Sequence, residues 1–81
     1  MKHARPDYDR FQDPEGKIPE DEPVFLIRGQ DPAGPAALEA YANLAELTGA
    51  EEELVHITRE HAEAMRIWQH QHPETVHPAN L

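Results

Sequence analysis

Residues 35–72, PAALEAYANLAELTGAEEELVHITREHAEAMRIWQHQH, decide the fold. Pro32 suits the first position of a helix, or Pro35 marks the first turn instead, and apolar side chains follow at helical spacing to about Leu47. Gly49 ends this helix, because glycine readily adopts the left-handed conformation that follows many helices. A second helical pattern continues until Pro73 ends it. Two helices with so short a connection pack antiparallel, so the stretch predicts a helical hairpin.

Each expected helix presents an apolar stripe, from which the core is predicted. In the first helix the stripe consists of Leu38, Tyr41, Ala42 and Ala45, with Leu44 and Leu47 as further candidates. In the second it consists of Leu54, Ile57, His61, Met65 and Trp68, with Val55 and Ala62 on its shoulder. If Leu54 is a core residue, Leu54→Ala should lower the free energy of unfolding by about 2–5 kcal/mol.

Capping signals mark the starts of both helices. Asp31 can cap the first helix through its side chain. Thr48 and Glu51 have the spacing of a capping box in front of the second helix. Glu51, Glu52 and Glu53 then occupy the first turn, where the positive end of the helix dipole favours carboxylates.

The segments outside the hairpin are irregular. Residues 1–23 are expected to form an extended arm, because prolines and charged residues break helices and strands there. Its large apolar side chains, which either anchor it on the helices or stay free for a partner, are Tyr8, Phe11 and Ile18. Residues 73–81 are expected to form a polar, flexible tail.

The apolar run at residues 24–27 has the composition of a short strand. A lone strand leaves backbone groups unpaired, so the run either pairs with the arm or another chain, or it plugs the core. The predicted fold class is therefore mainly α. An extended arm and a strand-like segment pack on an antiparallel helical hairpin, and residues 24–72 form the domain.

Negative charge is concentrated in the hairpin. The chain of 81 residues has a formal net charge of −9. Residues 1–30 carry five basic and seven acidic groups, and residues 31–81 carry two basic and nine acidic groups. The excess of seven acidic groups in the second part repels nucleic-acid phosphates and anionic lipids, and it attracts basic surfaces. We therefore expect a protein partner with a basic surface and no direct binding to nucleic acid or membrane.

Six glutamates are the candidate partner-binding residues. They are Glu46, Glu51, Glu52, Glu53, Glu60 and Glu63. Lysine at four-residue spacing usually balances such a helix surface. Here no lysine follows Lys17, and only Arg59 and Arg66 supply positive charge. Carboxylates without basic neighbours can stand in for phosphates, so a DNA-mimic mode is one interpretation and a solvated surface is the other.

Self-association is a further expectation, because two helices alone make a thin core. Tyr41, Met65 and Trp68 are the candidate residues. Tryptophan is a common interface anchor as well as a core residue. Two hairpins could combine into a four-helix arrangement, so a homodimer is the predicted oligomer.

The histidines raise the question of a metal. His56 and Glu60 lie four residues apart on one helix face, a spacing that can hold a divalent cation or form a weak pair. His56 and His61 are five residues apart and point about 140° away from each other, which excludes a two-histidine helical site. We expect no dedicated metal and no cofactor, and a histidine–glutamate metal module remains an alternative.

Catalytic signals are weak. The chain has no cysteine and no serine, and it has no glycine-rich phosphate loop. A domain of this size also has little room to enclose a desolvated pocket. We therefore expect a protein that is not an enzyme. The N-terminus is too charged for a signal peptide, and no apolar run could span a bilayer, so a soluble cytoplasmic protein is predicted.

The stretch PEDEPVFLIRGQD at residues 19–31 precedes an alanine-rich helix that contains Tyr41. It resembles small uncharacterised proteins encoded by bacteriophages and prophages. The resemblance extends over about residues 8–70 and transfers no catalytic residue. It implies an accessory role in the contest between phage and host or in virion production. In size and charge alone, the chain is also similar to anti-CRISPR and other DNA-mimic inhibitors.

Overall fold

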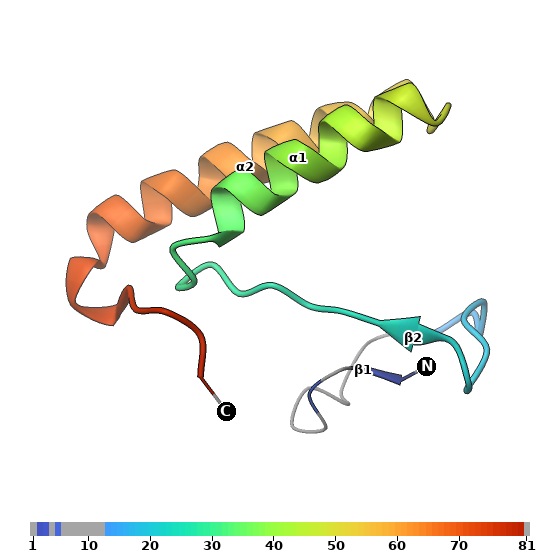
Figure 1. The fold of residues 1–81 in the computed structure, drawn as a ribbon, viewed down its shortest axis with the longest axis horizontal. Coiled ribbons are helices and arrows are strands. Elements are labelled where there is room, and N and C mark those ends of the chain that lie inside the picture. The colour runs from blue at the N-terminus through green and yellow to red at the C-terminus, as the bar shows by residue number, and fades with distance from the viewer. Residues whose placement is uncertain (1, 4, 6–12, 81) are drawn as a thin grey trace.

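A computed structural model describes residues 2, 3, 5 and 13–80 of the chain. Helix α1 spans Gly34–Leu47, helix α2 spans Glu52–Gln71, and a short 3-10 helix, η2, spans Pro73–Thr75. The predicted helical hairpin is confirmed, because α1 and α2 lie side by side and pack against each other (Figure 1). The extended chain that precedes α1 runs away from the hairpin on one side.

Helix α1 has Pro35 rather than Pro32 in its first turn, and it ends at Leu47. The predicted Asp31 cap is wrong, because Ala33 is the N-cap and no side-chain hydrogen bond caps the start of the helix. The Asp31 carboxylate accepts a hydrogen bond from the Ala33 N–H at 2.9 Å, just before the first turn. Pro35 lies in that turn, where a backbone N–H is not needed. At the other end, Gly49 has a φ of +88°, a left-handed conformation that glycine adopts without strain. The Ala50 N–H then donates to the Ala45 carbonyl at 2.9 Å and closes the connection.

The predicted capping box is wrong. Thr48 is the C-cap of α1, and its hydroxyl donates to the carbonyls of Leu44 and Ala45 at 3.0 and 3.2 Å. Glu51 is the N-cap of α2 but makes no side-chain capping bond. Thr48 therefore belongs to the end of α1 and does not cap α2. Helix α2 begins with Glu52 and Glu53, whose carboxylates are favoured by the positive end of the helix dipole.

The core is built from small side chains and one methionine. Its buried apolar residues are Ala42, Ala45, Val55, Ala62 and Met65. The stripe predicted for the second helix is therefore wrong except at Met65, because the shoulder position of Val55 and Ala62 is the face that packs on α1. The other four stripe residues, Leu54, Ile57, His61 and Trp68, are exposed.

The difference amounts to about one residue along α2, or about 100° around it. Small side chains at the contact let the two helix backbones approach closely, because alanine places only a methyl group between them. In α1 the outcome is similar. Ala42 and Ala45 are buried and Leu38 is half-buried, whereas Tyr41, Leu44 and Leu47 are exposed.

Gln69 ties the segment before α1 to the end of α2. Its half-buried amide donates to the carbonyls of Gly29 and Asp31, both at 2.9 Å. Gly34 packs beside this junction, since a Cβ atom there would lie 3.1 Å from Met65 Sδ and 3.3 Å from the Arg28 carbonyl oxygen. The turn between residues 28 and 34 is thus held against α2 by hydrogen bonds and close contact.

The strand-like segment is in a strand only at Val24, whereas Ile27 is half-buried and lines a hollow with Met65. Strand β2, Pro23–Val24, pairs in parallel with strand β1, Lys2–His3, so of the open alternatives the structure shows pairing with the arm. Phe25 is 68% exposed. The radius of gyration is 14.0 Å, larger than the roughly 12 Å of a compact chain of this length. Tyr8 and Phe11, the predicted arm anchors, lie outside the described residues, and Ile18 is half-buried.

The C-terminal tail returns toward the segment before α1. After η2, the His77 N–H donates to the Gln30 carbonyl at 3.3 Å, and the side chains of Gln30 and His77 lie 3.4 Å apart. The tail therefore makes specific contacts where the sequence predicts a flexible end. Within residues 13–80, neither helix combines the length and the apolar composition needed to cross a membrane.

Met65→Ala should test the observed core. Met65 is 8% exposed, so truncation leaves a cavity beside Gly34 and we expect the free energy of unfolding to fall by about 2–5 kcal/mol. Ile67→Ala, at a position that is 51% exposed, is the control and should cost less than about 1 kcal/mol. Urea denaturation followed by circular dichroism measures both. Equal losses of unfolding free energy in the two variants would contradict this core. Because Leu54 is 38% exposed, Leu54→Ala should also cost less free energy than its assignment to the core predicts.

Gln69→Glu should test the junction with almost no change in shape. The substitution removes both amide donors and places a carboxylate against two carbonyl oxygens, so we expect a loss of about 1–3 kcal/mol at neutral pH. Gln71→Glu changes an exposed side chain at the end of α2 in the same way and should have little effect. Thermal melts at pH 7 compare the two variants. A Gln69→Glu variant as stable as Gln71→Glu would show that the junction contributes nothing.

Candidate interaction surfaces

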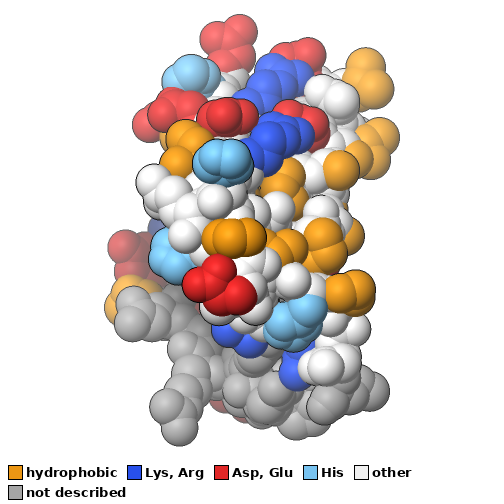
Figure 2. Space-filling view, turned by 90° about the vertical axis from the view of Figure 1, so that its left-hand side faces the viewer, with side chains coloured by type: hydrophobic (Ala, Val, Ile, Leu, Met, Phe, Trp, Pro, Cys, Tyr) orange, Lys and Arg blue, Asp and Glu red, His pale blue; other side chains and the backbone are white. Residues whose placement is uncertain are grey.

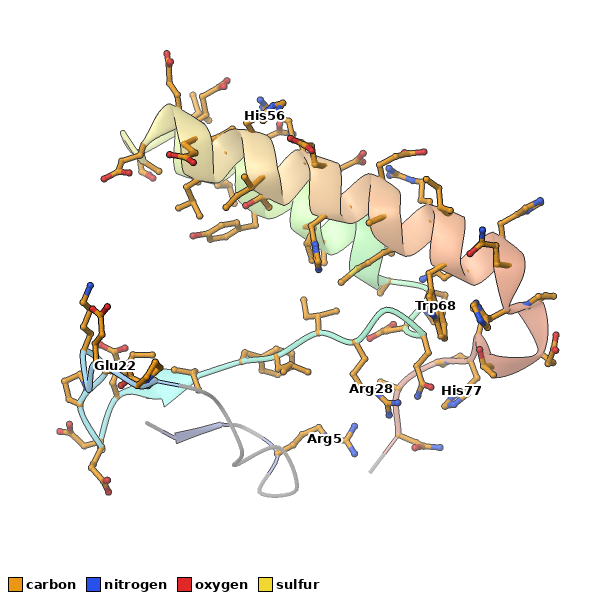
Figure 3. All side chains as sticks on the ribbon, turned by 180° about the vertical axis from the view of Figure 1, so that it is seen from behind. Arg5, Glu22, Arg28, His56, Trp68 and His77 are labelled. Atoms are coloured by element: carbon orange, nitrogen blue, oxygen red, sulfur yellow. The ribbon has the colours of Figure 1, made fainter. Side chains whose placement is uncertain are left out.

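The six glutamates predicted to bind a partner lie over one end and the outer side of the hairpin. We call them the acidic sector: Glu46, Glu51, Glu52, Glu53, Glu60 and Glu63, all of which are exposed. The four members within α2 fall in an arc of about 100°, as their spacing along the helix requires. His56 belongs to the same arc, and Figure 3 shows it on the side of α2 that faces away from the extended segment.

Two arginines neutralise one edge of the acidic sector. Arg59 Nη1 lies 3.3 Å from Glu46 Oε2, and its Nη2 donates to Asn43 Oδ1 at 3.1 Å. Arg66 lies 2.8 Å from Glu39 and 3.5 Å from Glu63. Both arginines of residues 31–81 therefore pair with carboxylates, and three of these contacts link α2 to α1. In Figure 2, basic side chains lie among acidic ones at the upper end of the molecule.

Glu39 and Asn43 are further parts of this edge, which the sequence analysis did not identify. The signal was present in the spacing, because Glu39, Asn43 and Glu46 form one face of α1. Arg66 hydrogen-bonds to the Glu39 carboxylate and holds the pKa of Glu39 below its ordinary value of 4.5. The same hydrogen bond raises the pKa of Arg66. These contacts fix which residues of α1 and α2 lie opposite each other.

The start of α2 keeps its full negative charge. Within residues 13–80, no ion pair involves Glu51, Glu52 or Glu53. Glu60 pairs with His56, which is charged only when it is protonated. Among residues 13–80, the carboxylates without an ion pair therefore include three consecutive ones at the end of the hairpin where the two helices connect, and Glu52 lines a hollow there with His56 and Arg59.

A second surface lies on the opposite side of the helix contact. We call it the apolar flank: Leu38, Tyr41, Leu54, Ile57, His61 and Trp68. Leu38, Tyr41, Ile57 and His61 line one shallow hollow, together with Thr58. His61 and Trp68 line the neighbouring hollow, with Ala64, Met65 and the segment at residues 27–30. His61 belongs to both hollows and lies between them.

The three residues predicted to mediate self-association have different environments. Met65 is buried in the core, whereas Tyr41 and Trp68 are exposed. The Trp68 ring stacks on the His72 ring with centroids 4.3 Å apart, and it lies on the side of α2 that faces Arg28 (Figure 3). Tyr41 and Trp68 come from different helices and belong to the same flank. Leu54 and Ile57, which the sequence analysis assigned to the core, lie beside them.

A third feature brings together three distant segments. Arg5, Arg28, Gln30 and His77 line a small hollow of about 60 Å³ with apolar neighbours. Figure 3 shows Arg5, Arg28 and His77 around the same region below the hairpin. Asp31 also lines this hollow and supplies a negative charge. The sequence pattern does not indicate it, because the three segments that contain Arg5, Arg28 and His77 are more than twenty positions apart.

The histidine, aspartate and glutamate side chains of the described residues do not form a metal centre. No group of three or more histidine, aspartate or glutamate side chains there could hold a metal ion. His56 and Glu60 form the pair that their spacing predicts. The hollows are open and shallow, and no buried side-chain polar atom within residues 13–80 lacks a hydrogen-bond partner. The surfaces offer extended contact areas for another macromolecule.

Comparison with known proteins adds no relative. No protein-family model, no curated protein and no solved structure matches the chain.

Glu39→Gln should reveal the Arg66 pair through its pH dependence. A carboxylate whose pKa is lowered on folding stabilises the protein above its unfolded pKa, near 4.5, and loses that contribution as the pH falls through the lower folded value. We therefore expect the wild-type chain to melt at a slightly higher temperature than Glu39→Gln at pH 5–7, with the difference vanishing in stronger acid. Thermal melts across this range measure it, and Glu53→Gln is the control. A difference that grows on acidification would contradict the assignment.

Proposed function

We propose that the chain is a non-enzymatic accessory protein of the phage or prophage type that binds and modulates a host protein through its acidic sector. The partner would present a basic, nucleic-acid-binding surface, as the targets of anti-CRISPR and other DNA-mimic inhibitors do. One observation carries the proposal: Glu51, Glu52 and Glu53 adjoin one another at the connected end of the hairpin without an ion pair among residues 13–80.

The shape of α2 supports this mode of binding. Its 20 residues span about 30 Å, comparable to the length of roughly nine base pairs of duplex DNA. The carboxylates of α2 lie between Glu52 and Glu63 and project from one side of the helix over about 17 Å, the length of roughly five base pairs. A rigid helix holds them without the entropic cost of ordering a loop, so a basic groove could exchange its phosphate contacts for carboxylate contacts.

The charge distribution also narrows the kind of partner. Two basic against nine acidic groups in residues 31–81 oppose direct contact with DNA or RNA. Rim charges of this sort mainly raise the association rate, and they make binding sensitive to salt. A cytoplasmic host protein that normally binds nucleic acid fits both properties.

The proposal is tested by neutralising the start of α2. We expect Glu51→Gln, Glu52→Gln and Glu53→Gln, combined in one variant, to abolish capture of basic proteins from a bacterial lysate by the immobilised chain. Duplex DNA added in excess should displace the same proteins from the wild-type chain, because both ligands would occupy one basic surface. Mass spectrometry of the fractions eluted by salt identifies the captured proteins.

The arm provides a matched control. Glu20→Gln, Asp21→Asn and Glu22→Gln remove the same number of consecutive exposed charges elsewhere in the chain. If capture depends only on net charge, both triple variants lose it equally, and the acidic sector has no special role. Capture that survives the triple change in α2, or that ignores salt and DNA, would also refute the proposal.

A further inference from the structure

The largest apolar side chains of the hairpin lie outside its core. On the apolar flank, Tyr41 is 54% exposed, Ile57 52%, Leu54 38% and Trp68 37%. Together with Leu38 and His61 they expose on the order of 400 Å² of side chain, given the roughly 150–250 Å² of a large aromatic residue. A patch of this size is within the range of the largest patch on a typical monomer, where it is often functional.

The core of a single chain is small in comparison. Three of its five buried apolar residues are alanines, and the other two are Val55 and Met65. Small domains with so little buried apolar area commonly gain stability by forming oligomers. Several of the side chains that could enlarge the core lie together on the apolar flank, whereas Leu44, Leu47 and Ile67 are exposed outside it.

Charge distribution favours another copy of the chain as the occupant of this flank. No member of the flank carries a carboxylate, an amine or a guanidinium. Thr58 and Ala64 beside it are uncharged, and Arg28 is the charged residue that lines the hollow next to Trp68. The carboxylates of Glu39, Glu46 and Glu63 lie at the opposite edge of the helix contact, where they pair with arginines. Two chains of net charge −9 could therefore meet through the flanks with these three paired carboxylates at the far edge, whereas Glu53 and Glu60, one turn from Ile57, would lie at the rim of the contact.

We propose that the apolar flank is a homodimer interface, in which two hairpins pack flank to flank as a four-helix arrangement. A two-fold axis brings the same patch of each copy into contact, so one self-complementary surface suffices. Two flanks and their polar rims would bury on the order of 1,000 Å² in total, near the lower limit for a specific complex. The dimer is therefore reversible, with a dissociation constant in the micromolar range, and it presents two acidic sectors on its outside.

Sedimentation equilibrium of the full chain tests the interface. From micromolar to millimolar concentration, the wild-type mass should rise toward twice the 9.2 kDa of one chain. Ile57→Glu should weaken dimerisation at least about 100-fold, because each dimer would bury two unpaired carboxylates. Circular dichroism of this variant should show unchanged helix content, since Ile57 is half exposed in a single chain.

Ile67→Glu is the matched control. Ile67 is 51% exposed on the same helix, but it lies about 80° around from Ile57 and lines neither hollow of the flank. It should dimerise as the wild-type chain does. Trp68, the only tryptophan, gives an independent readout, because its emission should shift to shorter wavelength as the wild-type concentration rises.

Three results would overturn the proposal. If the wild-type chain remained monomeric throughout the concentration range, the flank would not be a homodimer interface. Its occupant would then be the chain's own arm or a different protein. A dimer that persists in Ile57→Glu would place the contact elsewhere on the chain. Equal loss in Ile57→Glu and Ile67→Glu would indicate a general effect of charge. The proposed binding of a basic partner rests on Glu51, Glu52 and Glu53, and it is tested separately by the triple change of these residues.

Discussion

The contact between α1 and α2 is lined by small side chains, and most other features of the molecule depend on that. Ala42 and Ala62 are fully buried where the helices pack. Because such residues fill little space, the helices lie close together and the larger apolar side chains are displaced to one flank. The same orientation of α2 places Arg59 and Arg66 within reach of carboxylates on α1.

The hairpin consequently has two chemically different edges. Ion pairs and the Asn43 hydrogen bond occupy one edge, whereas aromatic and aliphatic side chains occupy the other. Exposed ion pairs contribute little stability individually, but they favour one register of the helices over its neighbours. The apolar edge favours contact with another surface, because burial of apolar area is the main driving force for association.

The two proposals use separate parts of this architecture. The acidic sector acts through long-range attraction and salt-sensitive contacts, whereas the apolar flank acts through burial at short range. A dimer that joins the flanks would carry its acidic sectors outward on both copies. Two such sectors on one rigid body could engage two basic sites, which would raise the apparent affinity without any new contact.

The sequence by itself determined that there are two helices, where they begin and end, and that negative charge gathers on them. Pro35, Gly49 and Pro73 act locally through backbone conformation, so their effects can be recognised without a tertiary structure. It did not determine which face of α2 is buried. The stripe through Leu54 and Ile57 and the stripe through Val55 and Ala62 have the same helical period, and Met65 belongs to both.

Only the tertiary structure decided between these faces, because the choice depends on how closely α1 can approach and on which side chains it offers opposite. Hydrophobicity favours the bulkier stripe, whereas close packing and the ion pairs of Arg59 and Arg66 favour the smaller one. The Gln69 junction was likewise invisible in the sequence, since it joins a side chain to carbonyls nearly forty residues away. Contacts of that kind arise from the path of the chain in space, which local patterns do not encode.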